Sequence, residues 1–215
     1  MVTMTLDLTT ELATARVLAV IRGTDTAGAI AAGTALLAEG IRVVEVALTT
    51  PGALQAIEAI RSTAPADALV GAGTVLTVAD VADVAAAGAQ FVVTPAVVES
   101  IPEAVRRGLP LAAGAFTPTE AYTAVRMGAS AVKLFPASVG GPAYLKGLRD
   151  PFPDIPFVAV GGVGLAELPG YLDAGAIAVG VGGPLVGDAA SGGDLDALRS
   201  RARAYLAAVT RRTTS

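Results

Sequence analysis

The sequence predicts an α/β protein that folds as a single (β/α)8 TIM barrel. Eight short apolar runs recur along the chain, alanine-rich amphipathic segments lie between them, and the connections are short. Strands that alternate with helices in this way are expected to form a parallel sheet with right-handed crossovers, and eight of them can close into a barrel. The eight runs cover residues 16–22, 42–48, 68–74, 90–94, 110–115, 131–136, 156–162 and 176–182.

The apolar runs are typical of strands buried on both faces, because they are rich in β-branched residues and bounded by glycine or proline. The segments between them, such as 26–40, 51–62 and 81–88, are typical of helices. Several helices are expected to end on a glycine, which can adopt the left-handed conformation that closes a helix, and several to open on proline or threonine. The glycines are Gly40, Gly88 and Gly128, and the openings are Pro51, Thr117-Pro118 and Pro142.

A chain of 215 residues is short for such a barrel, which typically needs roughly 250, so the loops must be minimal. We find no linker and therefore expect one domain over 1–215. Residues 1–15 are expected to form an extra helix that closes the bottom of the barrel, and 194–213 the last helix. The alternative is an open doubly wound sheet, but no G-x-G-x-x-G motif follows the first strand, where a nucleotide-binding sheet would carry it.

Composition narrows the class of function. The apolar fraction is 53%, charged residues make up 16%, and the formal net charge is −4, which suits a compact globular protein. No basic patch suggests nucleic acid as a partner, and no apolar run suggests a membrane. The first residues lack the pattern of a secretion signal, so we expect a cytoplasmic protein.

The chain contains no histidine and no cysteine. Acid–base catalysis must therefore fall to a carboxylate, lysine, tyrosine or water. Histidine-ligated metal sites are excluded, and no cluster of carboxylates suggests another kind of metal site. We expect neither a metal nor a cofactor.

Two charged residues interrupt the apolar strands. Lys133 lies in the run 131–136 and Glu45 in the run 42–48. Side chains alternate across a strand, so if the faces that carry these two residues point inward, they meet near the mouth of the barrel. The chain has two lysines against thirteen arginines, so a lysine inside a strand suggests chemistry that arginine cannot perform. An amine can condense with a carbonyl, and burial favours its reactive neutral form. The alternative is a buried Lys–Glu ion pair without chemistry.

Four glycines follow the last two strands, Gly161 and Gly162 after the seventh and Gly182 and Gly183 after the eighth. Barrels often bind phosphate in these two loops, because glycine lets backbone N–H groups approach an anion. Tight turns alone are the alternative explanation.

Three further residues end strands at the expected mouth. Thr74 could bind a substrate carboxylate through its hydroxyl or cap the next helix. Arg22 could hold a carboxylate with two hydrogen bonds or be an ordinary surface cation. Pro95 is expected to shape the pocket.

These residues lie in segments that together resemble the 2-keto-3-deoxy-6-phosphogluconate (KDPG) / 4-hydroxy-2-oxoglutarate (KHG) aldolase family, which includes 2-dehydro-3-deoxy-6-phosphogalactonate aldolase. The resemblance covers nearly the whole barrel. The matching segments are VIRG (20–23), EGIRVVEVALTTP (39–51), VGAGTVL (70–76), FVVTP (91–95), FTPTEA (116–121), VKLFPAS (132–138), GPAYLKGL (141–148) and VGGV (160–163).

The resemblance implies a class I aldolase without metal, usually a homotrimer, that acts on a small-molecule keto acid. It implies that Lys133 forms the Schiff base, that Glu45 is the acid–base residue and that Thr74 binds the pyruvate carboxylate. Phe135 and Pro95 would line the pocket. The backbone of Gly161, Gly162, Gly182 and Gly183 would hold the phosphate.

Three positions depart from the family pattern. Thr49 stands where some members have arginine, so Arg22 would supply the carboxylate contact. Gly183, followed by Pro184, replaces a serine that is common in the phosphate loop. Val160 replaces the threonine of many gluconate-type members and makes the chain similar to the phosphogalactonate type.

The expected activity is cleavage of KDPG to pyruvate and glyceraldehyde 3-phosphate, with cleavage of KHG to pyruvate and glyoxylate as a further activity. The alternative is cleavage of the 4-epimer, 2-keto-3-deoxy-6-phosphogalactonate. More remote alternatives are a sugar-phosphate isomerase or epimerase and a non-catalytic barrel that binds a sugar acid.

Overall fold

The computed structural model describes residues 6–213, with side chains as far as residue 210, and contains a closed barrel of eight strands in sequential order. Each strand pairs in parallel with the next, and β8 pairs with β1. The predicted (β/α)8 barrel is therefore confirmed, and every strand lies within one of the predicted runs. The strands are β1 (Val17–Ile21), β2 (Val43–Ala47), β3 (Leu69–Gly73), β4 (Val92–Val93), β5 (Leu111–Ala115), β6 (Ala131–Leu134), β7 (Phe157–Val160) and β8 (Ala178–Val181).

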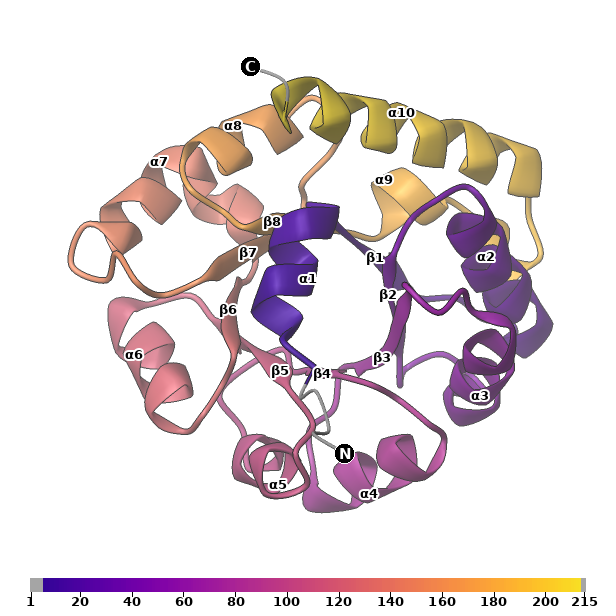
Figure 1. Ribbon diagram of the computed structural model, residues 1–215, viewed down its shortest axis with the longest axis horizontal. Coiled ribbons are helices and arrows are strands. Elements are labelled where there is room, and N and C mark those ends of the chain that lie inside the picture. The colour runs from indigo at the N-terminus through magenta and orange to yellow at the C-terminus, as the bar shows by residue number, and fades with distance from the viewer. Residues whose placement is uncertain (1–5, 214–215) are drawn as a thin grey trace.

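Helices form an outer ring around the barrel (Figure 1). They are α2 (Thr26–Ala38), α3 (Ala53–Thr63), α4 (Val78–Ala86), α5 (Ser100–Arg106), α6 (Pro118–Arg126), α7 (Ala137–Arg149), α8 (Leu168–Asp173), the short α9 (Gly183–Val186), a 3-10 turn at Ala189–Ser191, and α10 (Leu195–Thr213). None of the helices in residues 6–213 is long and apolar enough to cross a membrane.

The predicted helix start at Pro142 lies at a break within α7. This segment begins at Ala137, and a kink at Gly141 (φ 66°, ψ −175°) divides it into two helices just before the proline. Pro142 therefore starts the second part of α7. There its missing N–H and fixed φ suit a first helical turn.

The remaining helix, α1 (Leu8–Ala15), lies over one opening of the barrel (Figure 1). Its buried residues Leu8 and Leu12 pack in one cluster with inward-facing strand residues such as Leu18, Val43 and Ala131. Residues 1–5 of the predicted 1–15 segment lie outside the described residues. Because α1 fills the end where the strands begin, an accessible pocket can form at the end where they finish.

Candidate active site

Lys133 and Glu45 both point into the barrel, as the alternation predicts. Each follows an inward-facing residue by two positions, Ala131 on β6 and Val43 on β2. Both are buried, with exposed fractions of 7% for Lys133 and 1% for Glu45. An amine and a carboxyl group are therefore held inside an otherwise apolar barrel.

The two side chains do not form the ion pair that was the alternative to a catalytic role. In the described part of the chain, no ion pair joins Lys133 to Glu45. The Glu45 Oε2 atom is buried and has no hydrogen-bond partner. Burial raises the pKa of the Glu45 carboxyl, although the positive charges of Lys133 and Arg22 oppose this rise. A carboxyl group with a raised pKa and a free oxygen is suited to exchange protons with a bound molecule.

An aromatic ring flanks the lysine. Lys133 Nζ lies 5.2 Å from the centroid of the Phe135 ring, which is a cation–π distance. The ring in turn lies against Gly161, where an added Cβ would come within 2.9 Å of it. Phe135 thus forms one wall beside the amine.

Arg22 and Thr74 meet above the ends of β1 and β3. Arg22 Nη2 donates to Thr74 Oγ1 at 3.4 Å. Thr74 has a left-handed backbone conformation (φ 61°), which is uncommon for a residue other than glycine. The alternative role of Thr74 as a helix cap is wrong, because Thr77 caps α4 through a capping box with Asp80. A cation and a hydroxyl that converge at the mouth can bind a carboxylate.

A cavity of about 200 Å³ opens at this end of the barrel. Seven of the ten predicted site residues line it, namely Arg22, Lys133, Phe135, Gly161, Gly162, Gly182 and Gly183. Glu45 and Thr74 do not line it. The charge of Lys133 acts on the buried Glu45, and half-buried Thr74 accepts a hydrogen bond from Arg22. Pro95 is not in its lining; the Pro95 backbone instead packs against Gly114, the register partner of Lys133 on β5.

Glycine and apolar residues form most of the rest of the cavity lining. Gly161 and Gly162 both have positive φ, 93° and 72°, so glycine is required by the backbone there. Gly183 differs, because a Cβ at this position would have no atom within 4 Å. A side chain would fit at position 183, and this chain has none.

Sequence reasoning missed several of the lining residues. Val20 could have been found, because it lies on the same strand face as Arg22, two positions earlier. Gly180 belongs to the glycine-rich stretch with Gly182 and Gly183 that the sequence already indicated, and a Cβ there would lie 2.6 Å from the Val160 side chain. The missed lining residues are Val20, Val163, Val186 and Gly187.

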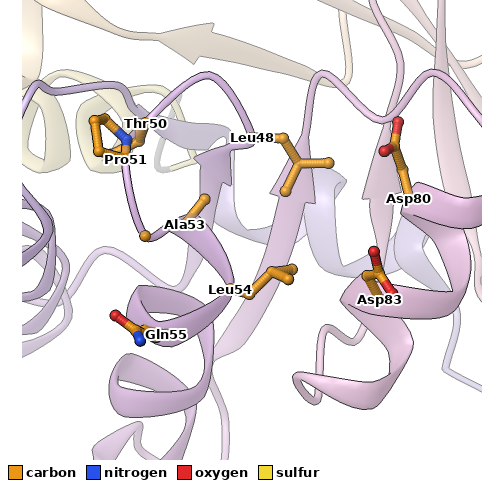
Figure 2. A pocket seen from close by; sticks show the side chains of 9 residues that line it. Leu48, Thr50, Pro51, Ala53, Leu54, Gln55, Asp80 and Asp83 are labelled. Carbon is orange, nitrogen blue, oxygen red and sulfur yellow. The ribbon is translucent and has the colours of Figure 1, made fainter.

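A second, more open pocket of about 550 Å³ lies between α3 and α4 (Figure 2). None of the predicted site residues lines it. Asp80, one of its two carboxylates, accepts hydrogen bonds from the N–H groups of Leu76 and Thr77, so its place there is explained by helix capping. Within residues 6–213, no group of three or more acidic side chains is arranged to hold a metal ion.

Several known proteins are similar to this chain over most of its length. The family model described as "Aldolase: KDPG and KHG aldolase" matches residues 8–200. A "Probable 2-dehydro-3-deoxy-6-phosphogalactonate aldolase" of Rhizobium meliloti (strain 1021) is 38% identical over 193 residues, which cover 89% of this chain and 90% of that protein. A "KHG/KDPG aldolase" of Escherichia coli (strain K12) is 38% identical over 172 residues, covering 79% and 80%.

A solved structure shares the fold at similar sequence identity. It is a KDPG aldolase from Legionella pneumophila "with pyruvate captured at low pH as a covalent carbinolamine intermediate". The TM-score is 0.83 at 32% identity, and the match covers 92% of this chain and 97% of that one. The chain therefore belongs to the KDPG and KHG aldolase family and is accordingly an aldolase, a lyase.

Proposed function

We propose that this chain is a class I aldolase that cleaves KDPG to pyruvate and glyceraldehyde 3-phosphate through a Schiff base on Lys133. The observation that carries the proposal is the position of Lys133, which is 93% buried (7% exposed) yet lines the cavity and has no ion pair with Glu45. A buried amine that is free of a carboxylate partner and open to a cavity can act as a nucleophile. The covalent pyruvate carbinolamine of the Legionella relative supports the same chemistry.

The reaction begins when the Lys133 amine attacks the C2 ketone of the keto acid. Glu45 assists the loss of water from the carbinolamine, which leaves a protonated imine. Glu45, through a bound water, then removes the proton of the C4 hydroxyl, and the C3–C4 bond breaks as its electron pair moves into the imine. Glyceraldehyde 3-phosphate leaves, the resulting enamine takes a proton at C3, and hydrolysis of the imine releases pyruvate.

The remaining predicted residues would orient the substrate. Arg22 and Thr74, in contact with each other at 3.4 Å, would hold the carboxylate, and Phe135 would pack against the chain of the bound acid. The phosphate would lie against the backbone N–H groups of the two glycine loops. These loops contribute Gly161, Gly162, Gly182 and Gly183 to the cavity.

The galactonate epimer is a second candidate substrate, and Val160 favours it. Val160 lines the cavity and offers no hydroxyl to a sugar acid, whereas many gluconate-type members have threonine at this position. The Rhizobium relative, which matches 89% of this chain, is named for the galactonate substrate. KHG remains a third substrate to test, because the Escherichia relative is named for both KHG and KDPG.

Borohydride reduction in the presence of pyruvate tests the proposal. We expect a stable pyruvyl adduct on Lys133 and none on Lys146, the other lysine of the chain. Lys133→Ala should remain folded but lose turnover and trapping. Labelling of Lys146 alone, or no labelling, would refute the mechanism and favour an isomerase or epimerase. A ligand-induced thermal shift without product would instead favour a non-catalytic sugar-acid-binding barrel.

A coupled assay of pyruvate release then defines the substrate. The ratio of kcat/KM for KDPG and for its 4-epimer measures the stereochemical preference, and unphosphorylated KHG measures how far the phosphate contributes. We also propose a homotrimer, on the resemblance to the family. Light scattering of the purified chain tests this assembly.

A further inference from the structure

Five buried polar residues stand out in the described part of the chain: Glu45, Lys133, Thr50, Thr94 and Ser100. The first two belong to the proposed chemistry, and the other three are hydroxyl residues without an assigned role. A buried hydroxyl is costly unless it is hydrogen-bonded. The partners of these hydroxyls therefore indicate what each one holds in place.

Thr50 holds the segment that carries Arg22. It lies in the loop after β2 and is 2% exposed. Its Oγ1 accepts a hydrogen bond at 3.3 Å from the N–H of Gly23, the residue that follows Arg22. A Cβ at Gly23 would clash with the backbone of Ala190, so Gly23 is confined between Thr50 and the 3-10 turn Ala189–Ser191. The backbone directly after Arg22 is therefore held on two sides.

Ser100 holds the segment that carries Thr74. It is the first residue of α5 and is fully buried. Its Oγ donates a hydrogen bond at 3.0 Å to the carbonyl of Val75, the residue that follows Thr74. Thr74 needs such support, because its left-handed backbone (φ 61°) is unfavourable for a residue with a branched Cβ.

We propose that Thr50 and Ser100 are positioning residues for the carboxylate-binding pair Arg22 and Thr74. Each hydroxyl bonds to the residue directly after one member of the pair. The Thr50 bond joins two loops, and the Ser100 bond joins the start of α5 to the loop after β3. Loops are the mobile parts of such a fold, so two buried cross-links hold the guanidinium and the hydroxyl at one separation. This inference rests on the proposed function, in which Arg22 and Thr74 bind the substrate carboxylate.

The test compares Thr50→Val and Ser100→Ala with the wild-type chain. The measurement is the concentration of pyruvate that gives half-maximal borohydride trapping of Lys133. The same concentration is measured for pyruvamide, the uncharged analogue of pyruvate. We expect the value for pyruvate to rise about two- to tenfold, the range for loss of one net hydrogen bond, with that for pyruvamide unchanged. Thr50→Ser and Ser100→Thr, which keep the hydroxyl, should restore the wild-type value.

A matched control removes a hydroxyl at the opposite end of the barrel. Thr9 Oγ1 donates at 3.1 Å to the carbonyl of Ser130, a bond between α1 and the start of β6. Thr9→Val should lower the melting temperature without changing the preference for pyruvate over pyruvamide. A double-mutant cycle with Arg22→Leu adds a second test, because Thr50→Val should have little further effect once the guanidinium is absent.

The outcomes separate the inference from the proposed function. If the wild-type chain cannot be trapped with pyruvate, both fail. Suppose instead that the wild-type chain is trapped. The positioning role alone is then overturned if the variants keep the wild-type half-saturation concentration for pyruvate, or if their values for pyruvate and pyruvamide rise by the same factor. Should Ser100→Ala not fold, Ser100→Cys, which keeps a small but weaker donor, must show the same selective loss.

Discussion

Gly73 makes room for the Glu45 carboxylate. A Cβ built on Gly73 would lie 2.6 Å from Glu45 Oε1 and 2.9 Å from Glu45 Cδ, although Gly73 is not among the glycines with positive φ. We therefore predict that Gly73→Ala displaces the carboxylate and lowers kcat about ten- to hundredfold, since catalysis is sensitive to misplacement of about 1 Å. Steady-state kinetics measure the loss, and borohydride trapping on Lys133 should persist.

Two other glycines provide controls for this substitution. Gly71 lies on the same strand, where a Cβ would instead lie 2.6 Å from the Phe91 ring. Gly71→Ala should lower stability while reducing kcat less than Gly73→Ala. Gly147 is exposed in α7 with open space around it, and Gly147→Ala should leave kcat unchanged. Equal loss of kcat at positions 71 and 73 would show that strain alone, not displacement of Glu45, slows the enzyme.

Glu45 should also determine the acid limb of the pH–rate profile. As a general base it acts in the ionised form, and burial raises its pKa. We predict that kcat rises with pH over a range above about 4.3, where an unperturbed glutamate titrates. Glu45→Gln should slow cleavage, keep imine formation and lose this limb. If Glu45→Gln keeps the same acid limb as the wild type, a group other than Glu45 determines that limb.

The same raised pKa predicts how stability depends on pH. The folded state binds the Glu45 proton more tightly than the unfolded chain does. The stability from this group is therefore fully present below the unfolded pKa and is lost as pH rises through the folded one. The glutamine of Glu45→Gln does not titrate. The difference in melting temperature, variant minus wild type, should therefore increase as pH rises above about 4.3 and then become constant.

Glu103 offers a control of opposite sign. Hydrogen bonds from Arg106 and Arg107 lower its pKa to about 2, so its contribution to stability is present above the unfolded pKa and lost as pH falls. Glu103→Gln should therefore be less stable than the wild type at neutral pH, and this difference should disappear in acid.

The outcome that would contradict the Glu45 prediction is a constant difference in melting temperature between Glu45→Gln and the wild type from pH 4 to 8. It would mean that burial does not perturb the Glu45 carboxyl.

The barrel and its charged pair could be predicted because both leave local signals. Alternation of apolar strand and amphipathic helix is a pattern within short windows. Lys133 and Glu45 stand out as charges inside apolar runs. Whether the two form an ion pair could not be predicted, because that depends on the shear and closure of the barrel.

Contacts between distant segments account for what the sequence did not predict. Thr50 is 27 residues from its partner Gly23, and Ser100 is 25 residues from Val75. A threonine in a loop, or a serine at the start of a helix, gives no indication of which distant segment it will contact. Gly73 shows the same limit, because the sequence does not reveal which side chain packs against a glycine at the end of a strand.

Arg22 is predicted to bind the carboxylate, and its removal tests this. Arg22→Leu should raise KM for the keto acid about ten- to hundredfold, the range for losing a charge-assisted hydrogen bond. Arg126→Leu is a matched control, because Arg126 is an exposed arginine in the last turn of α6. A value of KM that responds equally to both substitutions would mean that Arg22 acts through net charge alone.

Val160 should influence the choice between the two epimers. Val160 lines the cavity and is 5% exposed, and Val160→Thr keeps its shape while adding a hydroxyl that can bond to the substrate. We predict that the ratio of kcat/KM for KDPG over the galactonate epimer rises roughly tenfold, as expected for a new hydrogen bond to one stereoisomer. Val20→Thr places a hydroxyl on the β1 wall of the same cavity and should leave the ratio unchanged. If both substitutions shift the ratio alike, polarity of the cavity rather than the position of Val160 sets the preference.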